Sequence, residues 1–327
     1  MSPPTPRPLR PAEIPFPADV ATAVVRQYVD PSLTVTAVRP LHGGMVNRVL
    51  ELVTDAPEPA PGAAAAPDAP PTLLVAKIAA APDDAGFDLE ARALGYCSEH
   101  TRFPVPRVFA HFSNAAGFPG TCILMQRIPG HNLADARLSD TGRAVVQRQL
   151  GQHLAELHNC RRGTYGPCVT NAQHPRWLDR FGPTMLAQFQ AVRDQLSTPA
   201  RRVVEHVLSH LDQWLPETND PRLVHGDLWA TNILVDDSRP DRPDLTAFID
   251  GDFDFADPEY ELAYLKLFHT ADRDCFAVYH HHHRPRPGFD RRCRVYWLNT
   301  MMLHVARFGP RYLPTVEQLA EQTRQLT

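Results

Sequence analysis

The sequence lacks the features of membrane, secreted and nucleic-acid-binding proteins. It contains no apolar run of about 18 residues that could span a bilayer. Its six cysteines are scattered without CxxC pairs, unlike the dense disulfide framework of a small secreted domain. A formal net charge of −4 provides no basic field for nucleic acid. We therefore expect a cytoplasmic protein that acts on a small molecule, with no nucleic acid, membrane or obligate protein partner.

Length and composition suit a globular protein of two lobes. The chain has 327 residues, of which 43% are hydrophobic, enough for one large core or two modest ones. Residues 1–17 contain seven prolines, which predicts a disordered leader. Residues 56–71 are almost entirely Ala, Pro, Gly and acidic, which predicts a disordered hairpin insertion. We expect an N-terminal lobe over 18–126 and a C-terminal lobe over 127–327.

Hydrophobic periodicity assigns different structures to the two lobes. In the first, it predicts two helices, over 19–28 and 87–97, and four strands, over 33–38, 46–53, 72–78 and 120–126. In the second, apolar residues recur at helical spacing around 146–157, 182–215, 259–269 and 291–308. The sequence therefore predicts a small antiparallel sheet followed by a mainly helical lobe.

The most informative segment runs from residue 223 to residue 235, where two apolar strands flank a polar loop. The loop holds Asp227 and, five residues later, Asn232. In a kinase catalytic loop, such an Asp accepts the proton of the attacking hydroxyl, and the Asn binds Mg²⁺. A further strand, 245–249, ends at Asp250, where kinases place a second metal-binding carboxylate. We predict Asp227 as the base and Asn232 and Asp250 as metal ligands.

Three upstream features complete the same order. Lys77 follows alternating apolar residues on a strand, and Glu90 comes thirteen residues later on the next helix, so the two can form a phosphate-orienting ion pair. Before them, Gly43 and Gly44 form a turn whose backbone N–H groups can approach phosphates. Each feature alone is weak evidence, but their order along the chain is that of a kinase.

The loop His225-Gly226-Asp227-Leu228-Trp229, with Asn232, resembles that of aminoglycoside phosphotransferases and fructosamine kinases, two families of the protein-kinase-like superfamily. Segments 177–181, 260–263 and 294–312 are similar to fructosamine kinases in particular, and the resemblance covers residue 18 to the C-terminus. It implies an α+β, protein-kinase-like two-lobe fold with ATP between a small antiparallel sheet lobe and a mainly α-helical lobe.

The resemblance also implies roles for individual residues. By this resemblance, Trp229 flanks the sugar site, Asp227 is the base, and Asn232 and Asp250 hold Mg²⁺. The residues implied to bind ATP are Gly43, Gly44, Asn47, Lys77 and Glu90 at the phosphates and Met125, Gln126 and Ile128 at the adenine hinge. The Asp250-Gly251 pair stands where fructosamine kinases often have Asp-Pro, which leaves the substrate open.

Acidic and histidine-rich segments allow two interpretations each. Six carboxylates within residues 250–261 could attract a cationic amino sugar, with Asp252 and Glu261 as substrate candidates, or could serve helix capping at Asp257. The tract 280–283 could bind metal, but its proline-rich surroundings favour a solvated loop. His225 is expected to hold the loop backbone through a hydrogen bond.

The sequence therefore predicts an ATP- and Mg²⁺-dependent phosphotransferase that acts on a hydroxyl of an amino-sugar-type substrate. A fructosamine or ketosamine ranks first, and an aminoglycoside-like or other sugar-containing antibiotic, which would make this a resistance enzyme, ranks second. The alternative is a nucleotide-binding pseudokinase or regulatory module. A protein kinase is disfavoured because His225-Gly226-Asp227 departs from His-Arg-Asp.

Overall fold

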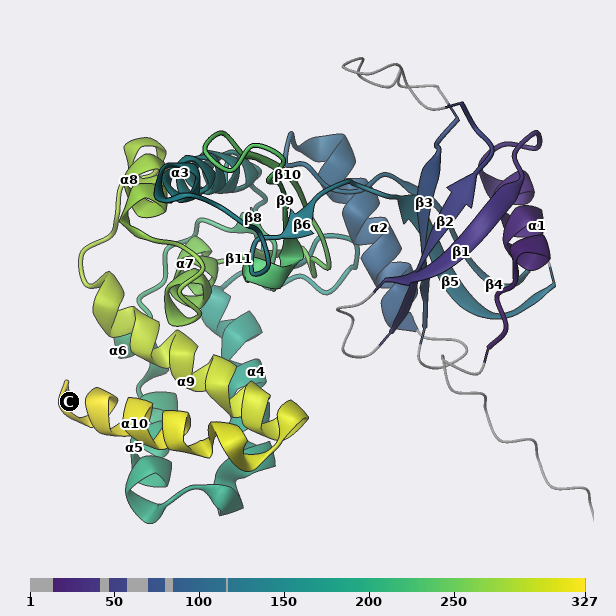
Figure 1. Ribbon diagram of the computed structural model, residues 1–327. Coiled ribbons are helices and arrows are strands. Elements are labelled where there is room, and N and C mark those ends of the chain that lie inside the picture. The colour runs from purple at the N-terminus through teal and green to yellow at the C-terminus, as the bar shows by residue number, and fades with distance from the viewer. Residues whose placement is uncertain (1–13, 42–46, 58–69, 80–84, 116, 327) are drawn as a thin grey trace, which may run out of the picture. The chain divides into compact units, whose positions relative to one another are not determined.

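The computed structural model describes residues 14–41, 47–57, 70–79, 85–115 and 117–326, which belong to two compact units (Figure 1). Unit 1 comprises residues up to Glu99 together with Pro104–Pro129, and unit 2 comprises His100–Phe103 and Gly130 onward. The units therefore divide at Pro129, three residues beyond the boundary expected from the sequence. Most of the predicted insertion, 58–69, lies outside the described residues.

Unit 1 contains one antiparallel sheet with a helix on each face. The sheet order is β1-β2-β3-β5-β4 among the described strands. The elements are α1 (Ala18–Tyr28), β1 (Val35–Leu41), β2 (Arg48–Thr54), β3 (Leu73–Ile78), α2 (Ala85–His100), β4 (Val108–Ala115) and β5 (Phe118–Gln126). Both helices and four of these strands were predicted, whereas β4 was not.

Alternation along β3 divides the core of unit 1 between the two faces of the sheet. Leu74 and Ala76 are buried in the cluster that contains α1, while Val75 packs against the cluster that contains α2. The two helices lie on opposite sides of the sheet (Figure 1). Because side chains two residues apart share a face, Lys77 is placed on the side of α2. The period of the strand thus decides which helix can supply a partner for this lysine.

The predicted disordered leader is wrong at its C-terminal end. Ile14 and Phe16 are only 2% and 4% exposed, and the Phe16 ring packs edge-on against Phe118 at a centroid distance of 5.0 Å. Burying two large apolar side chains offsets the entropy of ordering this short, proline-containing segment. The first thirteen residues lie outside the described part of the chain.

Unit 2 is mainly helical, as predicted. Its helices are α3 (Asp140–Leu157), α4 (Trp177–Val192), α5 (Thr198–Ser209), α6 (Leu211–Trp214), α7 (Pro258–Leu267), α8 (Arg273–His282), α9 (Phe289–Phe308) and α10 (Leu313–Arg324), with 3₁₀ turns η2 (Arg193–Gln195), η3 (Ala230–Asn232) and η4 (Pro310–Tyr312). Short strands form two sheets, β10-β9-β6 and β7-β11-β8, from β6 (His131–Asn132), β7 (Gly166–Pro167), β8 (Arg222–Val224), β9 (Ile233–Asp236), β10 (Asp244–Phe248) and β11 (Asp254–Ala256).

Two details of unit 2 differ from the sequence prediction. The expected helical segment 182–215 is divided, because Ser197 caps the start of α5 by accepting a hydrogen bond from the Ala200 backbone N–H. The histidine tract lies at the end of α8 rather than in a loop, because Asp272 caps this helix and Cys275 and Tyr279, one turn apart, are buried. Within the described ranges, no helix is long and apolar enough to cross a membrane.

Candidate active site

The predicted catalytic loop connects β8 to η3 and β9 in unit 2. His225 is fully buried, and its Nε2 lies 3.0 Å from the carbonyl oxygen of Ile249. Its Nδ1 accepts a hydrogen bond from the backbone N–H of Asp227, 3.3 Å away. The imidazole therefore ties the loop to the end of β10, and the backbone hydrogen bond predicted for His225 is present.

Asp227 and Asn232 are in direct contact. The amide nitrogen of Asn232 donates to the backbone oxygen of Asp227 at 2.9 Å and to its carboxylate Oδ2 at 3.2 Å. Asn232 is only 5% exposed, so its orientation is fixed by these bonds. Because its amide nitrogen is bound to Asp227, its amide oxygen remains as the atom that can bind a metal.

The segment after β10 lies along the catalytic loop. The backbone N–H of Ile249 donates to Asn232 O at 3.0 Å, and that of Asp252 donates to His225 O at 2.9 Å. Gly226 has φ = +88°, and a Cβ atom there would lie 3.2 Å from the Cβ of Asp252, so this close approach requires glycine. Asp250 is exposed and has φ = +58°. Asn232 and Asp250, eighteen positions apart in the sequence, thus lie on two segments that are hydrogen-bonded to each other.

Asn232 and Asp250 offer the type of ligand that Mg²⁺ prefers. An amide oxygen and a carboxylate are hard oxygen donors, which suit Mg²⁺ better than zinc or copper. No group of three or more His, Cys, Asp or Glu side chains among the described residues is arranged to hold a metal ion. The amide oxygen of Asn232 and the carboxylate of Asp250 are thus donors whose chemistry fits Mg²⁺.

In unit 1, Lys77 and Glu90 form the predicted ion pair. The Lys77 Nζ lies 2.7 Å and 2.8 Å from the two carboxylate oxygens of Glu90, and the side chains are 10% and 18% exposed. The Lys77 Nζ also lies 5.8 Å from the centroid of the Phe87 ring, at the start of α2. The pair is thus partly shielded from solvent, which strengthens its electrostatic interaction.

The other predicted nucleotide contacts remain predictions. Gly43 and Gly44 lie outside the described residues, and Asn47 immediately precedes β2. Met125 is 7% exposed, and Gln126 donates its backbone N–H to Arg107 O at 2.8 Å. The carbonyl oxygen of Ile128 accepts a hydrogen bond from the Arg127 guanidinium.

Of the three predicted substrate residues, Glu261 is placed differently from the expectation. It is 1% exposed, with Oε1 accepting the Gly226 backbone N–H at 2.9 Å and Oε2 lying 3.0 Å from His158 Nε2. Both oxygens are therefore engaged inside the protein, and a substrate cannot reach them. Trp229 is partly exposed and Asp252 is exposed, so both remain candidates for substrate contact.

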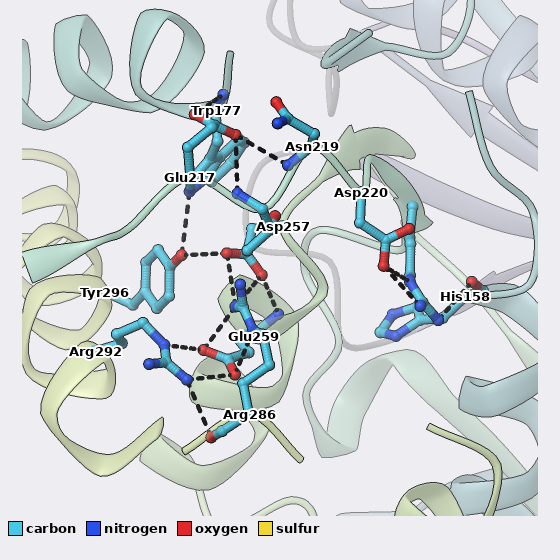
Figure 2. Close-up of polar contacts among 12 residues, drawn as sticks. His158, Trp177, Glu217, Asn219, Asp220, Asp257, Glu259, Arg286, Arg292 and Tyr296 are labelled. Carbon is cyan, nitrogen blue, oxygen red and sulfur yellow. Dashed lines mark hydrogen bonds and ion pairs between the residues drawn. The ribbon is translucent and has the colours of Figure 1, made fainter. Parts of the chain in front are cut away.

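Asp257 and Glu259, two further carboxylates of the acidic segment, are likewise buried. Arg286 donates two hydrogen bonds to Asp257, and Arg292 donates two to Glu259 (Figure 2). Burial raises the pKa of Asp257, and the Arg286 charge opposes that rise. Asp254 also pairs with Arg180, 2.6 Å away, so the exposed carboxylates of segment 250–261 are those of Asp250 and Asp252.

Tyr264 is a residue of the site that the sequence did not reveal. Its hydroxyl donates to Asp227 Oδ1 at 2.5 Å from helix α7. The signal available in the sequence was its spacing, because Tyr264 lies three residues after Glu261 and shares its helix face.

The histidine tract makes contacts inside unit 2. Arg222 donates to Nδ1 of His283 at 2.6 Å, and Nε2 of His283 lies 2.9 Å from Ala155 O. Burial lowers the pKa of His283, and the Arg222 charge acts in the same direction. The imidazole has both nitrogens engaged, and this supports a structural role.

A sheet unit with a strand-lysine and helix-glutamate pair, and a helical unit with an Asp–Asn loop, define a protein-kinase-like fold. The profile of the fructosamine kinase family matches residues 74–325. The chain belongs to the fructosamine kinase family.

Relatives from several organisms support this assignment. A protein of Escherichia coli named "probable ketoamine kinase" is 28% identical over 248 residues, covering 71% of this chain and 79% of that protein. A "probable ketoamine kinase" of Lactiplantibacillus plantarum is 32% identical over 105 residues, and the mouse ketosamine-3-kinase is 34% identical over 92 residues. These last two matches span 36% and 28% of the relatives' own length, and 32% and 28% of this chain.

Solved structures show the same fold. A Thermobifida fusca protein titled "putative fructosamine-3-kinase" superposes with a TM-score of 0.69 and 22% identity, over 94% of this chain and all of that one. The GDP complex of aminoglycoside 2'-phosphotransferase-IIIa superposes with a TM-score of 0.61 and 17% identity, over 94% and 97% of the two chains. The predicted likeness to fructosamine kinases and the predicted fold class are thereby confirmed.

Proposed function

We propose that this protein is an ATP- and Mg²⁺-dependent small-molecule kinase that phosphorylates a hydroxyl of a ketosamine-type substrate. The observation that carries the proposal is the direct contact between Asp227 and Asn232, on a loop bonded to the segment that bears Asp250. This contact unites a base and a metal ligand on one rigid support, which is the arrangement that phosphoryl transfer needs.

Each residue then has a defined task. The substrate oxygen attacks the γ-phosphorus, its proton passes to the Asp227 carboxylate, and the bond from the γ-phosphorus to the β-phosphate oxygen breaks to release ADP. Bound through Asn232 and Asp250, Mg²⁺ would neutralise phosphate charge. Lys77, oriented by Glu90, would bind the α- and β-phosphates. The intact set supports transfer over a nucleotide-binding module without activity.

The choice of acceptor rests on two kinds of support. The relatives named ketoamine and ketosamine kinases favour a sugar amine. Exposed Asp252, on the segment bonded to the loop, offers a carboxylate for the substrate's ammonium group. An aminoglycoside also carries sugar hydroxyls and amines and is therefore the second candidate.

The test is coupled-assay ATP turnover with Mg²⁺ over fructosamines, free sugars and aminoglycosides. Asp227→Asn should lower kcat by roughly 10²- to 10⁴-fold, the usual contribution of a general base, without changing the melting temperature substantially. Asp241→Asn, at an exposed position of unit 2, is the matched control and should keep full activity.

Turnover of fructosamines that depends on Asp227 would support the proposal. Turnover of aminoglycosides alone would replace the ketosamine with an antibiotic. ATP binding without turnover of any acceptor would contradict the proposal and favour the regulatory module.

A further inference from the structure

Both carboxylate oxygens of Asp227 accept a hydrogen bond from the protein. Oδ1 accepts the Tyr264 hydroxyl at 2.5 Å, whereas Oδ2 accepts the Asn232 amide at the longer distance of 3.2 Å. The Tyr264 bond is as short as charge-assisted O–H···O⁻ bonds commonly are. The shorter of the two hydrogen bonds to the carboxylate of the predicted base therefore comes from α7 and not from the catalytic loop itself.

Helix α7 holds two consecutive loop residues. Glu261 accepts the backbone N–H of Gly226, and Tyr264 donates to the side chain of Asp227. Residues three apart lie on one face of a helix, so one surface of α7 makes both contacts. A rotation of this helix would displace the backbone and the carboxylate of the loop together.

The helix itself is fixed at its start and along its length. Asp257 caps its first turn by accepting the Glu259 backbone N–H at 2.9 Å, and Arg286 and Arg292 bind these two carboxylates (Figure 2). Further along, the Trp297 indole donates to Ala263 O at 2.7 Å. The helix is thereby held both at its first turn and further along by contacts with other segments of unit 2.

The charged and titratable groups around Tyr264 keep its phenol protonated. Burial and the neighbouring Asp227 carboxylate raise the pKa of Tyr264 well above the ordinary value, and Tyr260 and Asp252 contribute in the same direction. Its ring also packs against Phe268 one turn later, with centroids 4.7 Å apart. The hydroxyl is therefore a permanent donor in a fixed position.

We propose that Tyr264 is a positioning residue that holds the Asp227 carboxylate by Oδ1 and so presents Oδ2 to the acceptor hydroxyl. Each carboxylate oxygen has two lone pairs, so Oδ2 can accept the substrate O–H alongside its long bond to Asn232. Without the phenol, the Asp227 side chain could rotate about χ1 and χ2, and fewer bound substrates would meet an aligned base. This inference rests on the proposed function.

Tyr264→Phe removes the hydroxyl and leaves the ring in place against Phe268. We expect kcat to fall about 10- to 100-fold, the range produced by loss of one hydrogen bond to a charged group, while KM for ATP and acceptor stays within about twofold. Tyr28→Phe is the control, since Tyr28 lies in α1 of unit 1 with its ring stacked on Phe112, and its activity should be unchanged. An unchanged kcat for Tyr264→Phe, or an increased one, would overturn the proposal.

A second measurement does not depend on turnover. With tyrosine labelled by ¹³C at Cζ in the full chain, the Tyr264 signal is the one missing from Tyr264→Phe. It should shift in Asp227→Asn, which replaces the acceptor, and stay in place in Asp241→Asn. A Tyr264 signal that does not shift in Asp227→Asn would refute the contact itself. If the signal shifts but wild-type protein phosphorylates no acceptor, the proposed function fails and the contact stands.

Discussion

Glu261 shows how a carboxylate in an acidic segment can serve the backbone rather than a ligand. Its two oxygens are bonded to Gly226 N–H and to His158, and His158 is itself fully buried with its Nδ1 2.8 Å from the Tyr279 hydroxyl. From the sequence alone, Glu261 and Asp252 cannot be told apart, because both are acidic residues that follow the catalytic loop. Only burial separates the two, and burial depends on how α7 packs.

Glu261→Ala therefore gives a test that separates a structural role from substrate binding. The substitution leaves the Gly226 N–H and His158 without their acceptor, which should lower the free energy of unfolding by on the order of 3 kcal/mol. Thermal melting should detect this, and kcat should fall because the loop is loosened. Asp252→Asn is the contrasting variant, and it should raise KM for a cationic acceptor with little change in melting temperature. A normal melting temperature for Glu261→Ala, with only KM raised, would restore the substrate role.

At the scale of elements, the sequence predicts best where a pattern is long and regular. The alternation before Lys77 placed β3 correctly, the kinase order of the motifs predicted its ion pair with Glu90, and the spacing of Asp227 and Asn232 implied their contact. Strand β4 was missed because His111, Ser113 and Asn114 interrupt its apolar pattern, and its hydrogen bonds to β5 come from tertiary structure. Contacts between distant segments, such as that of Tyr264 with Asp227, depend on packing that one-dimensional patterns do not contain.

The packing of α3 against α8 provides a prediction about a pair of helices. Gly151 of α3 faces α8 so closely that a Cβ atom would lie 2.4 Å from Cys275 O and 3.0 Å from the Cβ of Val278. Gly151→Ala should force the helices apart and destabilise the protein by about 1–3 kcal/mol, measured by denaturant unfolding. Gly95→Ala is the matched control, since Gly95 lies in α2 with nothing within 4 Å of the added Cβ. There the higher helix propensity of alanine should stabilise by about 0.5–1 kcal/mol. Equal effects at the two glycines would mean that α3 and α8 are not in this contact.

At the scale of the whole molecule, ligand binding should increase the free energy of unfolding. A ligand that binds only the folded protein adds about 2.7 kcal/mol when present at a hundred times its dissociation constant. MgATP at such a concentration should therefore raise the melting temperature of the protein, as measured by differential scanning fluorimetry.

Three changes to this experiment assign the shift to particular groups. Chelating Mg²⁺ with EDTA should remove most of the shift, since Asn232 and Asp250 would contact the nucleotide through the ion. Lys77→Met should reduce it, because the variant lacks the charge that Glu90 directs toward the phosphates. Asp227→Asn should retain it, because that carboxylate acts on the acceptor hydroxyl and not on ATP. A shift that survives EDTA would contradict the magnesium ligands, and a shift lost in Asp227→Asn alone would place this residue in nucleotide binding instead of proton transfer.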